Sequence, residues 1–300
     1  MRLITYSDNG NSRVGAVVDG GVADLGDRFE SMLTLIEEGN PEEVRSLAES
    51  VSPFAEIGEV ELQAPIPEPP RNLFCVGWNY LPHFEEGRGR RGNQEKDLPE
   101  YPVFFSKATT TVTGPNSEVP FDPAFSERMD YEAELAVVIG RRGRSIPAAD
   151  AMRYVFGYVA ANDVTARDVQ RRHGGQWLKG KSMDQSCPMG PWIVTTDEVP
   201  DPQDLQVKCH VNGVEKQNSS TKYMYFPISK IIEELSLAMT LLPGDIILTG
   251  TPEGVGWWRE PPEFLRPGDE VTVTVSGIGT LTNRIAERSL TRQEESPHVA

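Results

Sequence analysis

Alternating apolar and polar positions predict β-strands over most of the chain after residue 72. The clearest strand is Leu205–Val211, where every second residue is apolar and where Asn212-Gly213, a strong hairpin signal, follows. The other strands predicted in this part are Leu73–Val76, Val103–Phe105, Ala133–Ile139, Tyr154–Ala161, Trp192–Thr195, Asp245–Leu248 and Glu270–Val275.

Helical periodicity is rarer in the same part of the chain. It predicts helices at Ala148–Val155, Ala166–Arg172 and Ile228–Met239. Because strands and helices do not alternate regularly, a doubly wound parallel sheet is disfavoured. The pattern favours an α+β fold that is mainly β.

A proline-rich run at residues 64–70 separates a small N-terminal unit from the rest, since its four prolines fit neither a helix nor a central strand. The unit before it is predicted to hold strands and helices at Arg2–Tyr6, Arg13–Val18, Ser31–Glu38 and Pro41–Val51. The predicted organisation is an α+β domain over residues 1–63, a linker over 64–72, a main domain over 73–288 and a polar tail over 289–300.

Charge and composition exclude several classes of function. The 300 residues carry a formal charge of −16, so the protein is expected to repel nucleic acid and anionic membranes. The N-terminus lacks a signal-peptide pattern and no apolar run is long enough to span a membrane, which together predict a cytoplasmic protein. The three cysteines form no CxxC pair, which argues against disulfides and structural zinc.

An acidic segment precedes the most apolar strand. Asp130, Glu132 and Glu134 alternate along the sequence, so one strand would project all three side chains from the same face. Buried like charges need a compensating cation, and carboxylate oxygens suit a hard divalent ion. The alternative is a solvated acidic strand end.

A further carboxylate, Asp163, follows the predicted strand Tyr154–Ala161, with Thr165 expected to cap the next helix. Functional side chains are common at such a junction between a strand and a helix. The non-functional alternative is that Asp163 makes a second capping contact to the helix. Arg167 and Gln170 lie three residues apart on the predicted helix, so both could face one ligand.

Two other segments could carry chemistry. His83 and Glu86 would share a helix face after Pro82, where the carboxylate can orient the imidazole as a general base. Surface pairs at this spacing are also common. The glycine-rich turn at residues 250–256 offers backbone amides that, with the Thr251 hydroxyl, suit a carboxylate.

Residues 175–182 match GxxxxGK[ST], the pattern of a nucleotide-binding P-loop. That loop requires a strand before it and a helix after it. Here the preceding segment is predicted to be a helix, and Pro188 and Pro191 follow closely. The pattern is therefore disfavoured as a phosphate site.

Taken together, these segments resemble the fumarylacetoacetate hydrolase family. The motifs that carry the resemblance, in chain order, are Cys75-Val-Gly-Trp-Asn-Tyr with His83, Thr113-Gly-Pro115, Tyr131-Glu-Ala-Glu-Leu135, Asn162-Asp-Val-Thr-Ala-Arg-Asp168, Gly180-Lys-Ser182, Cys187-Pro-Met-Gly-Pro191, Asn212-Gly213 and Thr249-Gly-Thr-Pro-Glu-Gly-Val-Gly256. The resemblance implies a mixed β-roll, barrel-like core, usually in a homodimer, with Mg²⁺ or Mn²⁺ bound by carboxylates.

The resemblance also implies roles for individual residues. The matching positions are the metal ligands Glu132, Glu134 and Asp163, the catalytic residues His83, Glu86 and Lys181, and the substrate-contacting residues Arg167, Gln170 and Thr251. Pro82 departs from the family, whose members commonly have a charged or polar residue before the histidine.

The implied substrate is a small 2-oxo acid that chelates the metal. The first hypothesis is a hydrolase that cleaves the C–C bond of an acylpyruvate, such as fumarylpyruvate, with water activated by His83 and with Lys181 offsetting the oxyanion. The alternatives are decarboxylation of oxaloacetate and isomerisation of a 2-hydroxydiene diacid through the same enolate. A binding protein that keeps the fold without catalysis is the remaining possibility.

Overall fold

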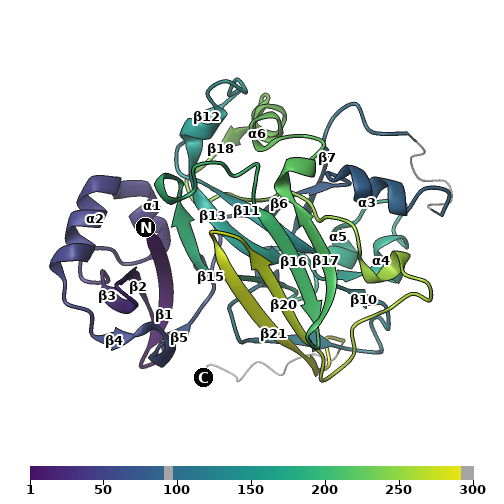
Figure 1. Cartoon of the computed structure of the whole chain (residues 1–300), viewed down its shortest axis with the longest axis horizontal. Coiled ribbons are helices and arrows are strands. Elements are labelled where there is room, and N and C mark those ends of the chain that lie inside the picture. Colours follow the sequence, from purple (N-terminus) through teal and green to yellow (C-terminus); the bar gives the residue numbers. More distant parts are fainter. Residues whose placement is uncertain (91–96, 292–300) are drawn as a thin grey trace, which may run out of the picture.

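Two large β-sheets form the body of the protein, for which a computed structural model describes residues 1–90 and 97–291 (Figure 1). The larger sheet has twelve strands. Ten of them follow the spatial order β4 (Ala55–Glu56), β3 (Gly21–Asp24), β2 (Asn11–Val18), β1 (Arg2–Asp8), β15 (Cys187–Thr195), β13 (Val155–Asn162), β11 (Ala133–Ile139), β19 (Ile246–Leu248), β6 (Leu73–Gly77) and β7 (Val103–Lys107). Two short strands, β5 (Glu61–Leu62) and β8 (Val112–Thr113), pair with β1 and β15.

The five strands of the second large sheet are β17 (Val214–Ser220), β16 (Gln206–Val211), β20 (Glu270–Val275), β21 (Gly279–Glu287) and β9 (Glu118–Phe121). This sheet lies at the front of the molecule in Figure 1, where β16 and β17 are drawn as green arrows and β20 and β21 as yellow arrows. Two small sheets pair β10 (Met129–Asp130) with β14 (Thr165–Ala166), and β12 (Gly143–Arg144) with β18 (Thr240–Leu241). Antiparallel and parallel pairs both occur.

Helices are short and lie around the sheets. The α-helices are α1 (Met32–Glu38), α2 (Pro41–Ser50), α3 (Leu81–Glu86), α4 (Arg167–Gln170), α5 (Leu178–Lys181) and α6 (Ile228–Ser236). The 3₁₀ turns are η1 (Ile57–Glu59), η2 (Thr109–Thr111), η3 (Ala151–Tyr154), η4 (Thr196–Glu198), η5 (Thr221–Tyr223) and η6 (Gly256–Trp258). The mainly β, mixed-sheet prediction is confirmed, but the sheets of the described residues do not close into a barrel.

Strand β11 lies inside the larger sheet and is buried on both faces. Leu135, Val137 and Ile139 pack into the core shared with the five-stranded sheet. Ala136 and Val138 point the other way, into the core shared with the N-terminal unit. Because side chains alternate along a strand, burial from both sides explains why this run is apolar at every position from 135 to 139.

The N-terminal unit continues the larger sheet rather than standing apart from it. Strand β1 pairs with β15 through Arg2 and Leu3, and α1 and α2 lie beside the sheet (Figure 1). Both predicted helices are confirmed, with Ser31 and Asn40 as their N-caps. The proline-rich run forms neither helix nor strand. The domain boundaries stay a prediction, and the predicted tail lies outside the described residues from position 292 onward.

Three local predictions are wrong. The helix predicted at Ala148–Val155 is only the 3₁₀ turn η3, because Val155 already belongs to β13. The helix predicted at Ala166–Arg172 is reduced to the single turn α4. By contrast, the helix predicted at Ile228–Met239 is confirmed as α6, which ends three residues early, at Ser236. Thr165 does not cap α4: it lies in β14, and its hydroxyl donates to the carbonyl oxygen of Asp163.

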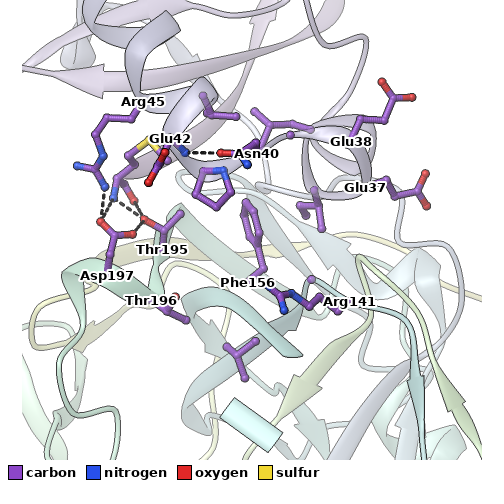
Figure 2. A pocket seen from close by; sticks show the side chains of 18 of the residues that line it. Glu37, Glu38, Asn40, Glu42, Arg45, Arg141, Phe156, Thr195, Thr196 and Asp197 are labelled. Atoms are coloured by element: carbon purple, nitrogen blue, oxygen red, sulfur yellow. Dashed lines mark hydrogen bonds and ion pairs between the residues drawn. The ribbon is translucent and has the colours of Figure 1, made fainter. Parts of the chain in front are cut away.

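A hollow of about 710 Å³ lies between the N-terminal unit and the main domain (Figure 2). The amino group of Met1 bonds to Thr195 on one side of it, and Arg45 pairs with Asp197 there. None of the predicted site residues lines this hollow. The candidate site therefore lies in another part of the main domain.

Candidate metal and active site

Three buried carboxylates meet where β11 and β13 pair. One oxygen from each of Glu132, Glu134 and Asp163 lies within 4.8 Å of the other two. Glu134 belongs to β11, Glu132 lies immediately before the first residue of β11, and Asp163 lies immediately after the last residue of β13. The antiparallel register of the two strands places Ala133 opposite Asn162, which brings the start of one strand beside the end of the other. The predicted carboxylate cluster is thus present in the structure.

The prediction that Asp130 shares one strand face with these residues is wrong. The chain leaves β10 after Asp130 and enters β11 only at Ala133. Asp130 instead accepts hydrogen bonds from the amides of Gly256 and Trp257 and pairs with Arg167. It supports the site through Arg167 rather than as a member of the triad.

Three buried cations surround the triad. Lys181 Nζ lies 2.6 Å from oxygens of both Glu132 and Asp163. Arg167 bridges Asp130 and Glu132, at 2.7 Å from each. Lys107 Nζ lies 2.8 Å from Asp163 Oδ1, and both groups are fully buried. Lys107 is not among the residues that the sequence motifs predict for the site, although a lysine at the end of the otherwise mostly apolar segment Val103–Lys107 is a usable signal.

The surrounding charges shift the pKa values of Glu132 and Glu134 in opposite directions. Burial opposes the ionisation of Glu132, but the charges of Lys181 and Arg167 outweigh it and lower its pKa to about 2. Burial, reinforced by the charges of Asp163 and Glu132, raises the pKa of Glu134 well above its usual value. Burial would lower the pKa of Lys181, but Asp163 and Glu132 raise it, so Lys181 stays an ammonium.

The donor set fits a hard divalent cation. Counting Asp130, the cluster contains four carboxylates, against the three cations Lys107, Lys181 and Arg167. Glu134 accepts a hydrogen bond from the amide of Gly250 at 2.7 Å but joins none of the ion pairs that the described residues form. An added cation would offset this excess negative charge, and oxygen-only ligands suit Mg²⁺ or Mn²⁺.

The predicted His83–Glu86 pair is present on α3. His83 Nδ1 lies 2.6 Å from Glu86 Oε1, and the other oxygen of Glu86 accepts the Gly254 amide at 2.8 Å. A carboxylate on Nδ1 favours the tautomer whose proton is on that nitrogen, so Nε2 is left as the acceptor. Pro82 lies in the first turn of α3, where a proline is tolerated, so it does not disrupt the pair.

The backbone amides of the glycine-rich turn donate hydrogen bonds to carboxylates of the protein itself. Its amides at Gly250, Gly254 and Gly256 bind Glu134, Glu86 and Asp130, respectively. The first two glycines have φ of 101° and 98°, a left-handed conformation that favours glycine. The expectation that these amides suit carboxylates is confirmed, and the carboxylates that they bind and orient are side chains of the site itself.

Two carboxylates of the triad open onto a small cavity of about 30 Å³, which neither Asp163 nor Glu86 lines. The predicted site residues that line it are His83, Glu132, Glu134, Arg167, Gln170, Lys181 and Thr251. Aromatic side chains of Trp78, Phe105 and Trp177 complete the wall. The Thr251 hydroxyl already donates to the carbonyl oxygen of Ala133, so it can contact a ligand only as an acceptor unless that bond breaks.

The P-loop interpretation fails on geometry. Residues 175–182 follow helix α4 and a turn instead of a strand, and α5 is a single turn of four residues. Lys181, which would hold phosphates in a P-loop, pairs with two carboxylates. The lysine therefore belongs to the triad.

Gly180 fixes the position of Lys181, and this yields a first prediction. A Cβ at Gly180 would lie 2.3 Å from the backbone nitrogen of Gln170, so Gly180→Ala forces α5 away from α4. We expect a loss of about 1–3 kcal/mol in the free energy of unfolding and a lower kcat, measured by denaturant unfolding and steady-state kinetics. Gly58→Ala, at a position with no atom within 4 Å, is the control and should change neither.

Comparison with known proteins decides the family. The family model described as "Fumarylacetoacetate (FAA) hydrolase C-terminal" matches residues 72–286. The chain belongs to the fumarylacetoacetate hydrolase family. This confirms the resemblance inferred from the sequence motifs, and the relatives of this chain that carry functional names are enzymes.

Individual members of the fumarylacetoacetate hydrolase family extend the comparison. "Oxaloacetate tautomerase YisK" of Bacillus subtilis is 45% identical over 265 residues, which cover 85% of this chain and 86% of the relative. The structure of a fumarylacetoacetate hydrolase from Exiguobacterium antarcticum superposes with a TM-score of 0.84 at 38% identity, over 96% of this chain and 100% of that one. A maleylpyruvate hydrolase from Sphingobium, solved with manganese(II) and pyruvate, has a TM-score of 0.79 at 29% identity, with the same coverage.

No helix among the described residues is both long and apolar enough to span a membrane. A cytoplasmic location and a homodimer stay predictions. The assignment of the individual site residues to catalysis, substrate contact and metal ligation also stays a prediction.

Proposed function

We propose that the protein is a divalent-metal-dependent oxaloacetate tautomerase, which interconverts the enol and keto forms of this 2-oxo diacid. One observation carries the proposal: His83, with Nε2 as its acceptor, lines the same cavity as Lys181 and two carboxylates of the triad, Glu132 and Glu134. A proton acceptor, a cation and a metal-binding cluster around one small space suit proton transfer next to a carbonyl. The similarity to the Bacillus subtilis tautomerase agrees with this reaction.

Glu132, Glu134 and Asp163 would hold the metal, Mg²⁺ or Mn²⁺, with manganese present in the Sphingobium structure. When bound, the metal supplies Lewis-acid polarisation of the substrate's oxygens. The residues of the chain supply the other functions. Arg167 and Gln170 line the cavity as polar contacts for the substrate, and the Lys181 ammonium offsets negative charge that develops on the 2-oxygen.

The proton transfer itself needs a single base. His83 Nε2 takes the proton from the enol hydroxyl, and the O–H electron pair forms the carbonyl at C2. The electron pair of the C2–C3 double bond then forms a C–H bond at C3 with the proton of the imidazolium, which returns His83 to its neutral form. Glu86 holds the ring in place and stabilises the imidazolium, and no water is consumed.

Acylpyruvate hydrolysis, the first hypothesis from the sequence, is the second candidate. The Sphingobium enzyme, a maleylpyruvate hydrolase, shares the fold over 96% of the chain. In that reaction His83 Nε2, the acceptor that faces the cavity, would take a proton from the attacking water molecule. Oxaloacetate decarboxylation and diene-diacid isomerisation remain alternatives that use the same enolate.

Four assays on the metal-reconstituted protein test the proposal. Enol-oxaloacetate is followed by loss of its ultraviolet absorbance, with malate dehydrogenase consuming the keto form. Pyruvate release is measured from oxaloacetate, fumarylpyruvate and acetylpyruvate. Tautomerisation well above the uncatalysed rate, lost with EDTA, supports the proposal. Faster pyruvate release from an acylpyruvate would favour the hydrolase, and release from oxaloacetate would favour the decarboxylase.

His83→Gln is expected to lower kcat for tautomerisation by about 100- to 10,000-fold, because it removes the only proposed proton carrier. Its matched control, His210→Gln on strand β16 of the other sheet, should keep the wild-type rate. Near wild-type turnover by His83→Gln would assign the proton transfer to another group.

A further inference from the structure

A second small cavity adjoins the first and differs from it in charge. It also measures about 30 Å³ and shares His83, Arg167 and Gln170 with the cavity at the triad. Its lining adds Arg171, Trp257 and Trp258 and contains no carboxylate. In a protein of charge −16, a cavity that is lined by two arginines and no acid is a local site for an anion.

Arg167 and Arg171 both have guanidinium N–H groups that could donate to a ligand in the second cavity. Arg167 is buried, and its Nη2 has no hydrogen-bond partner even though Nε and Nη1 are paired. An unpaired buried donor is costly unless a ligand satisfies it. The Arg171 guanidinium lies 4.8 Å from the ring centroid of Trp257 and 5.5 Å from that of Trp258. No carboxylate among the described residues pairs with it.

We propose that Arg171, together with the free Nη2 of Arg167, binds the carboxylate of the substrate that is distal to the metal, and so makes the enzyme selective for 2-oxo diacids. The inference rests on the proposed function, because it assumes that the 2-oxo acid end of the substrate lies at the triad. The other carboxylate of oxaloacetate then points past His83 into the second cavity. The rings of Trp257 and Trp258 hold the Arg171 fork in place for a bidentate contact.

The competing occupant of this cavity is an apolar group. Four tryptophans, Trp78, Trp177, Trp257 and Trp258, contribute to its wall, and they could stack on an uncharged acyl or aryl chain. Charge decides against it, because an apolar group would leave the Arg171 guanidinium without an anion and the Nη2 of Arg167 without an acceptor. Phenylpyruvate therefore serves as the probe for this alternative.

The test measures binding separately from turnover. Calorimetry on the whole protein with Mg²⁺ gives Kd for oxaloacetate, pyruvate and phenylpyruvate, of which only the first has a distal carboxylate. We expect the wild type to prefer oxaloacetate. Arg171→Met should weaken oxaloacetate binding about 10- to 100-fold and leave pyruvate binding unchanged, since a hydrogen-bonded charge pair is lost. Arg171→Lys, which keeps the charge without the fork, should recover part of the affinity.

Arg172→Met is the matched control, because Arg172 is exposed and does not line the second cavity. It should bind oxaloacetate as the wild type does. Equal affinity of the wild type for oxaloacetate and pyruvate, tighter binding of phenylpyruvate, or an unchanged Kd in Arg171→Met would each overturn the inference. If the wild type binds the diacid selectively through Arg171 but does not accelerate tautomerisation, the proposed function fails and the diacid subsite stands.

Discussion

Glu134→Gln is expected to lower kcat/KM about 1,000-fold or more and to leave the metal-free protein at least as stable as the wild type. Glutamine keeps an oxygen that can accept the Gly250 amide but removes one of three crowded carboxylate charges. The activity falls because a Lewis acid contributes several kcal/mol to stabilising charge in the transition state. Kinetics with added Mg²⁺, together with thermal unfolding in EDTA, measure the two effects.

The raised pKa of Glu134 predicts how the stability of the metal-free protein depends on pH. Because the folded state binds this proton more tightly than the unfolded state, stability falls as pH rises from the usual glutamate range toward the raised pKa. Lowering the pH within that window should therefore stabilise the metal-free wild type, and should do so less in Glu134→Gln. Glu215→Gln, on the exposed part of β17, should behave as the wild type in every assay. Mg²⁺ binding by Glu134→Gln with wild-type affinity would remove Glu134 from the ligand set.

The parts of the site that sequence predicts correctly depend on local geometry. Glu132 and Glu134 lie two residues apart next to a strand, and His83 and Glu86 lie one helical turn apart. Spacing of this kind fixes which side chains can meet before any tertiary contact forms. Asp163 was predicted from its place after a strand, and the β11–β13 register brings it to the same point.

Contacts between distant segments could not be predicted in this way. The amides of residues 250–256 were expected to be free, but three carboxylates from other segments use them. The helix predicted at Ala148–Val155 does not form, because Val155 starts β13, which pairs with strands on both sides. The strand pairing that joins the N-terminal unit to β15 involves Arg2 and Leu3, a register too short to leave a periodic signal in the sequence.

Lys107 is the most consequential of these hidden contacts, and we expect Lys107→Met to lower the free energy of unfolding by about 3–5 kcal/mol. The fully buried ammonium lies 2.8 Å from Asp163 Oδ1 and also donates to the carbonyl oxygens of Val164 and Ser186. Methionine fills much the same space but leaves the buried carboxylate without this partner. Urea unfolding of the metal-free protein measures the loss.

Two further variants separate this loss from a general cost of removing a lysine. Lys208→Met removes a half-buried lysine whose partner Glu215 is 3.9 Å away, and should cost at most about 1 kcal/mol. The double variant Lys107→Met with Asp163→Asn should lose less stability than the sum of the two single variants, because the charge left unpaired by the first change is absent in the second. Strict additivity would mean that Lys107 stabilises the fold without acting through Asp163. A loss in the double variant that is smaller than the sum would instead show that Lys107 stabilises the buried charge of Asp163, at the point where the metal is expected to bind.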